Sequence, residues 1–287
     1  MTDTLDRRTF LGALGTAVGA AAFGPAARAR LPGTRTRLRR IGLELYTVRE
    51  QMKRDPVGTL HQVRVIGYDQ VELLWSWNNF GQTTAELKAT LEHEGLRAPS
   101  AHIAPELLLH DWQRSLDTAN SIGQQYLIVP SLPEETDHSL DAWKRWADHF
   151  NVAGAAARRA GLWLAFHNEP NHMTPIDGQV PYDVFIARTD PKAVRLQLDT
   201  GNMIMGGGDP LAYLHRYVDR YWSFHIKDVV ADRSHDTELG RGTVNLRAFL
   251  AAIPEIHRKP CYVEQETSAD PLASARIDYN YLKNLSF

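Results

Sequence analysis

The sequence predicts a closed barrel of eight parallel β-strands surrounded by helices, the (β/α)8 or TIM-barrel class of α/β fold. Short β-rich segments alternate with longer segments of helical periodicity from Ile41 to the end of the chain. Strands that are separated by helices are joined by right-handed crossovers and therefore form a parallel sheet. The strand and helix units together occupy about 250 residues, which is the usual length of such a barrel.

The strands are predicted from β-rich segments and the helices from the spacing of apolar residues. The strands are Ile41–Val48, Tyr68–Leu74, Arg97–Ile103, Gln125–Pro130, Leu162–His167, Val194–Asp199, Tyr221–Ile226 and Cys261–Glu264. The helices between them include Pro56–Ile66, Thr84–Glu94, Trp112–Ile122, Leu140–Ala160, Val184–Arg188, Pro210–Val218 and Asn245–Ile253. Helix stops are predicted at Gly67, Gly95, Gly123 and Gly161, because glycine commonly ends a helix.

An open, doubly wound parallel sheet is the alternative to a barrel. Such a sheet carries a glycine-rich turn after its first strand when it binds a dinucleotide. This chain has Leu45-Tyr46-Thr47-Val48-Arg49 at that point, so the barrel is favoured. We predict a single barrel domain over residues 41–287, with no second domain.

The composition excludes several other classes of protein. The 287 residues are 43% hydrophobic and 23% charged, which is typical of a globular chain and not of a disordered or fibrous one. A net charge of −2 lacks the basic excess that binding to nucleic acid demands. A lone cysteine, Cys261, cannot form an internal disulfide, and we expect it to be a small buried hydrophobe.

The N-terminal segment resembles a twin-arginine signal peptide. Arg7-Arg8 precede Phe10, an apolar run over residues 13–24 and the small-x-small sequence Ala27-Arg28-Ala29. A frayed amphipathic helix is the alternative reading of this segment. The run is about half of the ~20 residues that a membrane-spanning helix needs, so no stable membrane insertion is expected.

The resemblance implies a signal peptide over residues 1–29, followed by an arginine-rich linker over residues 30–40. It further implies that the twin-arginine export machinery recognises the chain and that the mature protein is periplasmic or exported. Because this pathway carries folded proteins, it suits a chain that binds a metal in the cytoplasm.

Polar residues stand at the C-terminal ends of seven of the eight predicted strands, where the active sites of such barrels lie. Any one of these residues has a structural explanation as a satisfied hydrogen-bonding group. Together they indicate a site. His167, Asp199, His225 and Glu264, from strands five to eight, would converge around one divalent cation, which the mixed nitrogen and oxygen ligands allow to be Mn, Fe, Co, Zn or Mg.

The same strand ends resemble the sugar phosphate isomerase/epimerase family of xylose isomerase-like TIM barrels. The resemblance covers Ile41 to about Tyr281, and its matching segments are Leu45–Arg49, Gly67–Leu73, Ser100–His102, Phe166–Asn168, Leu198–Asn202, His225–Asp228, Gly240–Gly242 and Val263–Glu266. It implies that Asp199, His225 and Glu264 are metal ligands and that the end of strand five supplies the fourth. Many members have a glutamate there, whereas this chain offers His167, with Glu169 two residues later, and we predict His167 as the ligand.

The resemblance implies a reaction that begins with removal of a proton beside a carbonyl. A divalent ion that chelates adjacent carbonyl and hydroxyl oxygens stabilises the resulting enediolate. Glu169, Glu264 and Glu266 are the candidate bases, and Glu169 is preferred because a metal-bound carboxylate is a weaker base. His102 is a further catalytic candidate. Lys227 would neutralise an oxyanion, or else form a salt bridge with Asp228.

The predicted substrate contacts surround these catalytic candidates. Trp75 and Trp77 follow strand two and would pack against a sugar ring, or else fold over the rim as ordinary packing. Tyr46, Glu72 and Glu266 stand at the ends of strands one, two and eight and are also expected to contact substrate.

The sequence therefore predicts a metal-dependent sugar isomerase or epimerase that acts on a small-molecule sugar or glycoside. A dehydratase or lyase acting on a keto-sugar or 3-keto-glycoside is the nearest alternative, because an enediolate beside a leaving group expels it. An exported sugar-binding protein with a degenerate site is the alternative from another class. A nuclease of the endonuclease IV type would need more zinc ligands and a basic groove. Homo-oligomerisation is left open.

Replacing both Arg7 and Arg8 by lysine is expected to block export, because the adjacent arginines are the feature that the twin-arginine pathway recognises. The uncleaved precursor should then accumulate in the cytoplasm, as judged by cell fractionation and the mass of the chain. Normal export of the double variant, with cleavage after Ala29, would contradict the signal-peptide assignment.

Overall fold

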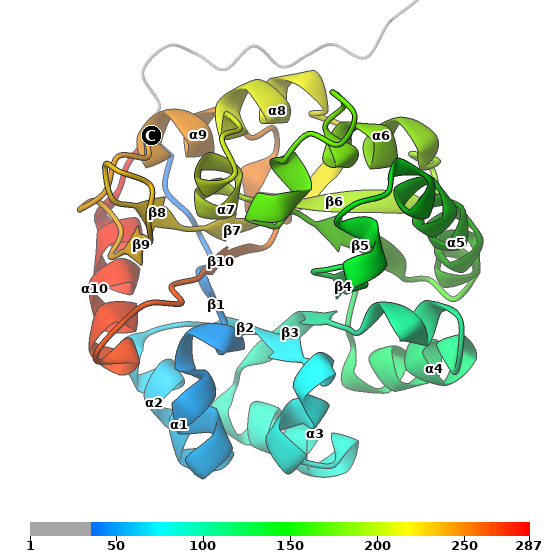
Figure 1. Cartoon of the computed structure of the whole chain (residues 1–287). Helices are drawn as coiled ribbons and strands as arrows, with labels where there is room; N and C mark the ends of the chain where they lie inside the picture. The colour runs from blue at the N-terminus through cyan, green and yellow to red at the C-terminus, as the bar shows by residue number, and fades with distance from the viewer. Residues whose placement is uncertain (1–35) are drawn as a thin grey trace, which may run out of the picture. The chain divides into compact units, whose positions relative to one another are not determined.

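The eight predicted strands form one closed barrel in the computed structural model, which describes residues 36–287 (Figure 1). The order around the barrel is β1-β10-β7-β6-β5-β4-β3-β2, and every neighbouring pair is parallel. The predicted fold class is confirmed. The predicted signal peptide and residues 30–35 of the predicted linker lie outside the described residues.

The barrel strands agree closely with the segments predicted from the sequence. They are β1 (Gly42–Glu44), β2 (Gln70–Leu74), β3 (Arg97–His102), β4 (Tyr126–Val129), β5 (Trp163–His167), β6 (Val194–Asp199), β7 (Tyr221–Ile226) and β10 (Cys261–Val263). The first strand is shorter than predicted, because the Glu44 carboxylate accepts a hydrogen bond from the Tyr46 amide and starts a helical turn.

Helices cover the outside of the barrel, as Figure 1 shows. They are α1 (Arg49–Arg54), α2 (Pro56–Ile66), α3 (Thr84–Glu94), α4 (Trp112–Ile122), α5 (Leu140–Arg159), α6 (Pro181–Arg188), α7 (Thr200–Met205), α8 (Pro210–Arg216), α9 (Leu246–Ala252) and α10 (Pro271–Asn284). Short 3-10 helices lie at η1 (Leu45–Val48), η2 (Trp75–Gly81), η3 (Pro105–Leu108), η4 (Glu134–Thr136), η5 (Pro170–Met173) and η6 (Ile256–Arg258).

The bounds of α2, α3 and α4 are those predicted, because the sequence carries their caps. Asp55 accepts a hydrogen bond from the Gly58 amide at the start of α2, and Thr83 and Glu86 form a capping box at the start of α3. Gly95 and Gly123 end α3 and α4 with positive φ angles of 66° and 84°. The helices α1, α7 and α10 were not predicted.

The N-terminal end of the barrel is filled by stacked side chains. The Arg195 guanidinium lies 3.4 Å from the ring centroid of Trp163 and 3.7 Å from that of Trp222, and it donates a hydrogen bond to Tyr126. All four residues stand at or near the starts of their strands. These side chains therefore close the barrel interior at this end.

A loop between β7 and α9 is organised by one carboxylate. The antiparallel pair β8 (Asp228–Val229) and β9 (Asp236–Thr237) begins this loop. Asp228 accepts hydrogen bonds from four backbone amides, those of residues 229, 240, 242 and 244. A Cβ atom at Gly242 would lie 2.2 Å from Asp228 Oδ1, so the turn accepts only glycine there.

Within the described residues, the structure has no helix that is both long enough and apolar enough to cross a membrane. The longest, α5, buries one face against the barrel with Trp143, Trp146 and Phe150. Trp143 and Trp146 are therefore part of the core and not of the site.

Asp278→Asn is expected to stabilise the fold at neutral and alkaline pH. Asp278 is fully buried in α10, and burial raises the pKa of its carboxyl to about 7. This folded-state pKa lies above the unfolded value. The contribution of the protonated Asp278 carboxyl to the free energy of unfolding is therefore fully present below about pH 4 and is lost as the pH rises through 7. The asparagine can still accept the hydrogen bond from the Leu239 amide.

Urea unfolding at pH 4.5, 6 and 8 measures this effect. We expect Asp278→Asn to gain up to ~4 kcal/mol over wild type at pH 8 and little at pH 4.5. The control is Asp219→Asn at an exposed position, which should change the free energy of unfolding little at any of the three pH values. A gain at Asp278 that did not depend on pH would contradict the explanation.

Candidate active site and metal centre

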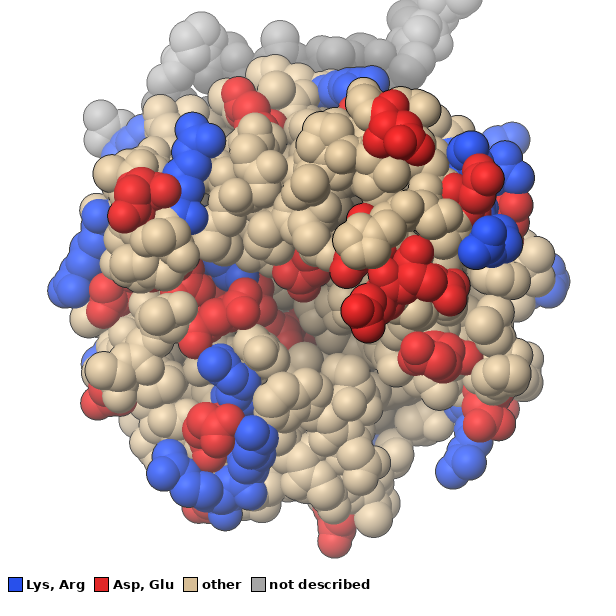
Figure 2. All heavy atoms as spheres, in the orientation of Figure 1, with Lys and Arg blue, Asp and Glu red and all other residues tan. Residues whose placement is uncertain are grey.

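A cavity of about 420 Å³ opens at the C-terminal ends of the barrel strands. Figure 2, drawn from the same side as Figure 1, shows acidic side chains gathered around a hollow in the middle of this face. The predicted site residues that line the cavity are Tyr46, Trp77, His102, His167, Glu169, Glu264 and Glu266. Those that lie beneath it, with no exposed surface, are Glu72, Asp199, His225 and Lys227.

Trp75 lies away from this cavity. It lines a separate hollow with Asn78 and Leu107, whereas Trp77 lines the cavity itself. The two tryptophans are two residues apart in the η2 turn, whose irregular backbone directs their rings to different places. The geometry therefore favours the packing explanation for Trp75 and leaves Trp77 as the aromatic wall.

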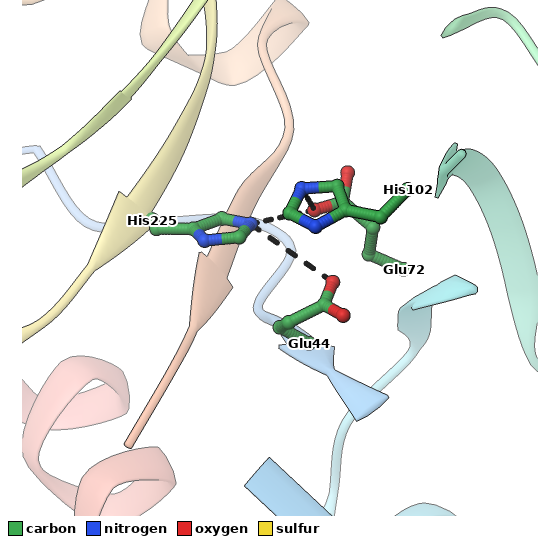
Figure 3. A group of neighbouring side chains, drawn as sticks. All are labelled: Glu44, Glu72, His102 and His225. Atoms are coloured by element: carbon green, nitrogen blue, oxygen red, sulfur yellow. Dashed lines mark hydrogen bonds and ion pairs between the residues drawn. The ribbon is translucent and has the colours of Figure 1, made fainter. Parts of the chain in front are cut away.

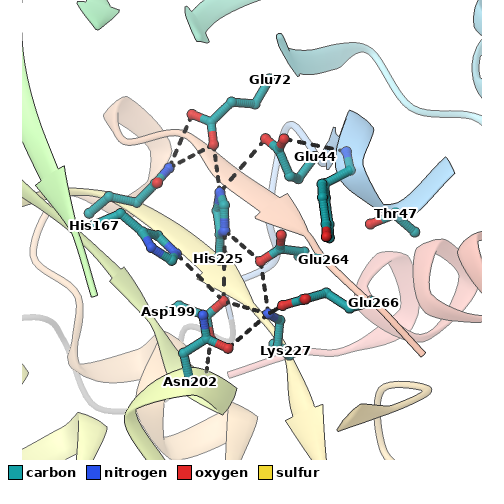
Figure 4. Close-up of polar contacts among 12 residues, drawn as sticks. Glu44, Thr47, Glu72, His167, Asp199, Asn202, His225, Lys227, Glu264 and Glu266 are labelled. Atoms are coloured by element: carbon teal, nitrogen blue, oxygen red, sulfur yellow. Dashed lines mark hydrogen bonds and ion pairs between the residues drawn. The ribbon is translucent and has the colours of Figure 1, made fainter. Parts of the chain in front are cut away.

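The four predicted metal ligands meet at the floor of the cavity. His167 ends β5, Asp199 ends β6, His225 lies on β7, and Glu264 follows β10, so they come from four consecutive barrel strands. One ligand atom from each of the four lies within 4.8 Å of the others. The His225 Nδ1 atom is 2.9 Å from Glu264 Oε2 and 3.7 Å from Asp199 Oδ2 (Figure 4).

Unsatisfied polar atoms within this cluster indicate that the residues fit a divalent cation. Neither ring nitrogen of His167 has a hydrogen-bond partner, although the side chain is almost completely buried. Its Nε2 atom lies 3.7 Å from Asp199 Oδ2, which is paired with the Lys227 ammonium. Buried polar groups normally have partners. Burial lowers the pKa of His167 to about 4, so the imidazole is neutral, which is the form that binds metals. Two imidazoles and two carboxylates suit a transition metal ion.

Glu72 supports His225 from below. Its Oε2 atom lies 2.5 Å from His225 Nε2 (Figure 3), and its carboxylate also accepts hydrogen bonds from Ser100 and Gln197. Burial acts to raise the pKa of Glu72, but His102 and His225 outweigh it and hold the pKa well below its usual value. The carboxylate therefore stays charged and orients His225, a role unlike the substrate contact predicted for it.

Lys227 carries its charge into the centre of the site. Its ammonium lies 2.6 Å from Glu266, 3.0 Å from Glu264 and 3.1 Å from Asp199. These carboxylates outweigh the burial of Lys227 and raise its pKa well above the usual value. The alternative salt bridge to Asp228 does not form, because Asp228 is occupied by backbone amides.

A glycine makes room for this lysine. Gly201 lies in the segment Asp199-Thr200-Gly201-Asn202, which begins at the end of β6. A Cβ atom at Gly201 would lie 2.6 Å from the Lys227 side chain. Asn202 accepts a hydrogen bond from the Lys227 ammonium at 3.0 Å. The segment thus places the Asp199 carboxylate and the neutral Asn202 side chain beside the Lys227 ammonium.

The pKa values of two carboxyl groups on the cavity wall are shifted in opposite directions. Burial raises the pKa of Glu169 well above its usual value, although Lys227 opposes this effect. Burial acts in the same direction at Glu264, but Lys227 and His225 outweigh it, and its pKa is about 2. Glu169 is held by a hydrogen bond of 3.0 Å from the Asn202 side chain. Of these two groups, Glu169 is therefore the better proton acceptor.

Tyr46 and Trp77 form an aromatic wall. Their ring centroids are 5.5 Å apart with the planes nearly perpendicular, at 87°. Arg49 stacks on the Tyr46 ring at 4.3 Å and donates hydrogen bonds to the backbone oxygens of Tyr46 and Glu266. This arginine ties the wall to the loop that carries Glu266.

Several supporting residues were not predicted. Ser100 and Gln197 each stand two positions before a predicted site residue, His102 and Asp199, and so share the same inward face of a strand. Glu44 is the last residue of β1 and the N-cap of the η1 turn that carries Tyr46. Polar residues at inward positions of buried strands were the signal that could have identified all three.

Comparison with known proteins agrees with this architecture. The profile of the xylose isomerase-like TIM barrel family matches residues 60–285. The chain belongs to this family. The predicted xylose isomerase-like barrel family is thereby confirmed.

Known relatives and structures carry several activities. An inosose dehydratase from Lactiplantibacillus plantarum is 30% identical over 213 residues, which are 66% of this chain and 65% of that protein. The matches to such dehydratases span between 39% and 65% of their length. A sugar phosphate isomerase/epimerase from Parabacteroides distasonis has the same fold, with a TM-score of 0.76, 24% identity and coverage of 86% and 98% of the two chains. The IOLI protein, solved with a bound zinc atom, has a TM-score of 0.66, 15% identity and coverage of 84% and 95%.

Asp199→Ala is expected to remove the ion held at the cavity floor while the barrel stays folded. Asp199 lies at the C-terminal rim, away from the packed core at the other end of the barrel. Inductively coupled plasma mass spectrometry of the purified, metal-loaded chain should show one ion fewer per chain than in wild type. Circular dichroism should be unchanged. Glu169→Gln is the control and should keep the ion, whereas an unchanged metal content in Asp199→Ala would remove the metal-site hypothesis.

Proposed function

We propose that this chain is a metal-dependent enzyme that removes the proton beside the carbonyl of an uncharged keto-sugar or cyclic keto-polyol, and then eliminates a neighbouring hydroxyl as water. The observation that carries the proposal is the convergence of Glu169, Glu266 and His102 on one cavity directly above the four candidate metal ligands. The inosose dehydratases among the relatives support elimination as the outcome.

His167, Asp199, His225 and Glu264 would hold the metal. When bound there, a divalent ion would polarise the carbonyl and an adjacent hydroxyl of the substrate and so acidify the proton between them. The zinc in the IOLI structure supports a metal of this kind in the fold. The ligand set is equally compatible with Mn, Fe or Co, and Mg is the least suited to two imidazoles.

Glu169 is proposed as the base that takes the proton. Its carboxylate lies on the cavity wall, is oriented by Asn202 and is 3.6 Å from His167 Nδ1. Glu264 is less suited, because Lys227 and His225 already stabilise its charge. Proton transfer requires a positioned group within hydrogen-bond reach of the carbon, which a residue on the cavity wall can satisfy.

A second group must give a proton to the departing hydroxyl. His102 is proposed for this step, because it lines the cavity from β3, two strands away from β5 and Glu169 in the barrel order. Its Nε2 atom is fixed at 2.9 Å from Gln197 Oε1. The base and the acid therefore face the substrate from different sides.

Lys227 is proposed to balance the negative charge that develops on the substrate oxygen. It is fully buried, and its ammonium is in contact with Glu264 and Glu266, both of which line the cavity. A fixed positive charge in a site of low dielectric stabilises an oxyanion more strongly than it would in water.

The cavity lining supports an uncharged substrate. The described residues that line the cavity include three glutamates and neither lysine nor arginine, so the lining offers no cationic side chain to bind a phosphate group. Tyr46 and Trp77 offer the apolar surface on which a sugar or cyclitol ring packs. Export of the mature protein, which we also propose, is consistent with a substrate that carries no phosphate.

Isomerisation or epimerisation is the second candidate outcome. Glu169 and Glu266 follow β5 and β10, which are not neighbours in the barrel, so one carboxylate can remove a proton and the other can return it on another side. Without a leaving group beside the carbonyl, the same first step then moves or inverts a substituent.

Solvent exchange at the alpha carbon tests the shared first step. In D2O, with substrates drawn from a panel of ketoses and cyclic keto-polyols, mass spectrometry and NMR should detect deuterium beside the carbonyl. Glu169→Gln is expected to reduce this exchange at least ~100-fold while keeping the metal, because a general base contributes about 10²–10⁴ in rate. Glu264→Gln should lower both metal content and exchange.

Binding of a sugar without exchange or turnover would contradict the enzymatic proposal and favour a sugar-binding protein. Turnover without any deuterium at the alpha carbon would count against free proton exchange. Loss of water from the product distinguishes elimination from isomerisation.

A further inference from the structure

We propose that His172 is a positioning residue, which holds Glu169 at the cavity wall through the Glu169 backbone. His172 lies on η5, is 2% exposed and is not one of the residues that line the cavity. The amide nitrogen of Glu169 donates a hydrogen bond of 3.0 Å to the Nδ1 atom of His172. The inference rests on the proposed role of Glu169 as the base, and it adds a residue that acts without touching substrate.

The ring of His172 is held between two aromatic side chains. It stacks on Phe166 with the ring centroids 5.2 Å apart and the planes 20° from parallel. Trp143 of α5 meets it nearly at right angles, with the centroids 5.0 Å apart. Phe166 directly precedes His167 at the end of β5, so the histidine ring is fixed against the strand that carries the site.

The hydrogen bond requires one particular form of the His172 ring. A ring nitrogen that accepts from an amide carries no proton, so the imidazole is neutral and its proton lies on Nε2. A phenylalanine ring would make the same stacking contacts with Phe166 and Trp143. Packing alone therefore does not account for a histidine here, whereas the need for an acceptor beside the Glu169 amide does.

Three attachments hold the end of β5 and the residues that follow it. The Asn168 side chain exchanges hydrogen bonds of 2.9 and 3.1 Å with the backbone of Asp199. Asn202 donates to the Glu169 carboxylate at 3.0 Å, and His172 accepts from the Glu169 amide. Removing the His172 acceptor would release the backbone of Glu169 and leave the other two attachments in place.

The η5 turn that carries His172 is itself fixed on two sides. Asn171 donates a hydrogen bond of 2.9 Å to Asp137, which precedes α5. On the other side, a Cβ atom at Gly206 would collide with the backbone oxygen of Pro170, so the turn packs tightly against the end of α7. His172 is thus a rigid support and not a flexible neighbour.

The position of Glu169 matters because it must reach a proton on a substrate carbon. A general base works only within hydrogen-bond reach of the proton that it removes. A misplacement of about 1 Å can cost ~10²-fold in rate. Loss of the His172 acceptor is therefore expected to slow proton removal while the binding of substrate and metal is kept.

Solvent exchange in variants of the full, metal-loaded chain tests this assignment. His172→Phe keeps an aromatic ring without an acceptor, so we expect kcat for deuterium incorporation to fall ~100-fold, with KM and metal content unchanged. His172→Asn places an oxygen at the same point along the side chain as Nδ1 and should recover most of the rate. His149→Phe, at an exposed position of α5, is the control and should match wild type. The substrates are those ketoses and cyclic keto-polyols that exchange in wild type.

A measurement on the amide itself requires no substrate. In the ¹⁵N-labelled chain, NMR should show that the Glu169 amide exchanges its hydrogen with solvent faster in His172→Phe than in wild type or His172→Asn, because it has lost its acceptor. Circular dichroism checks that each variant is folded. His172→Leu, which also lacks an acceptor, takes the place of His172→Phe if that variant does not fold.

The outcomes distinguish this inference from the proposed function. If wild type exchanges no proton of any substrate, the proposed function fails and the amide measurement alone decides whether His172 holds Glu169. If wild type and folded His172→Phe exchange substrate protons equally fast, or protect the Glu169 amide equally, the positioning role is overturned and the proposed function stands. A rate that is lost in His172→Phe and not recovered in folded His172→Asn also overturns it, since the ring and not the acceptor would then matter.

Discussion

The accumulation of acidic side chains at one end of the barrel is the constraint on which the rest of the structure depends. Six carboxylates converge there, those of Glu44, Glu72, Glu169, Asp199, Glu264 and Glu266. Buried carboxylates need compensating partners. Lys227 meets three of them, the histidines meet others, and Ser100, Gln197 and Asn202 supply neutral donors. The buried imidazole of His167, whose two ring nitrogens have no hydrogen-bond partner, marks where a cation is proposed to bind.

His225 links the two halves of this arrangement. It lies between the carboxylates of Glu264 and Glu72, with one ring nitrogen toward each. Its orientation therefore determines the geometry of the floor of the cavity and of the buried contacts of Glu72 alike. A change on either side would be transmitted to the other through a single rigid ring.

The sequence contained enough to predict the barrel and most of the site, because both depend on local signals. Capping residues and C-terminal glycines delimit α2, α3 and α4, and polar residues interrupt apolar strands where the strands end. The packing partners could not be predicted in the same way. Whether Lys227 would meet Asp228 or Asp199, and whether Trp75 or Trp77 would face the cavity, depends on loop conformations that only the closed barrel determines.

The stack of Arg195 between Trp163 and Trp222 determines how small molecules can reach and leave the cavity. With the far end of the barrel filled, the cavity has the C-terminal mouth as its route to solvent. A compound that enters must leave by the same path, past the same ring of carboxylates and the Tyr46–Trp77 wall. A bound product must therefore leave through this opening before the next substrate molecule can enter.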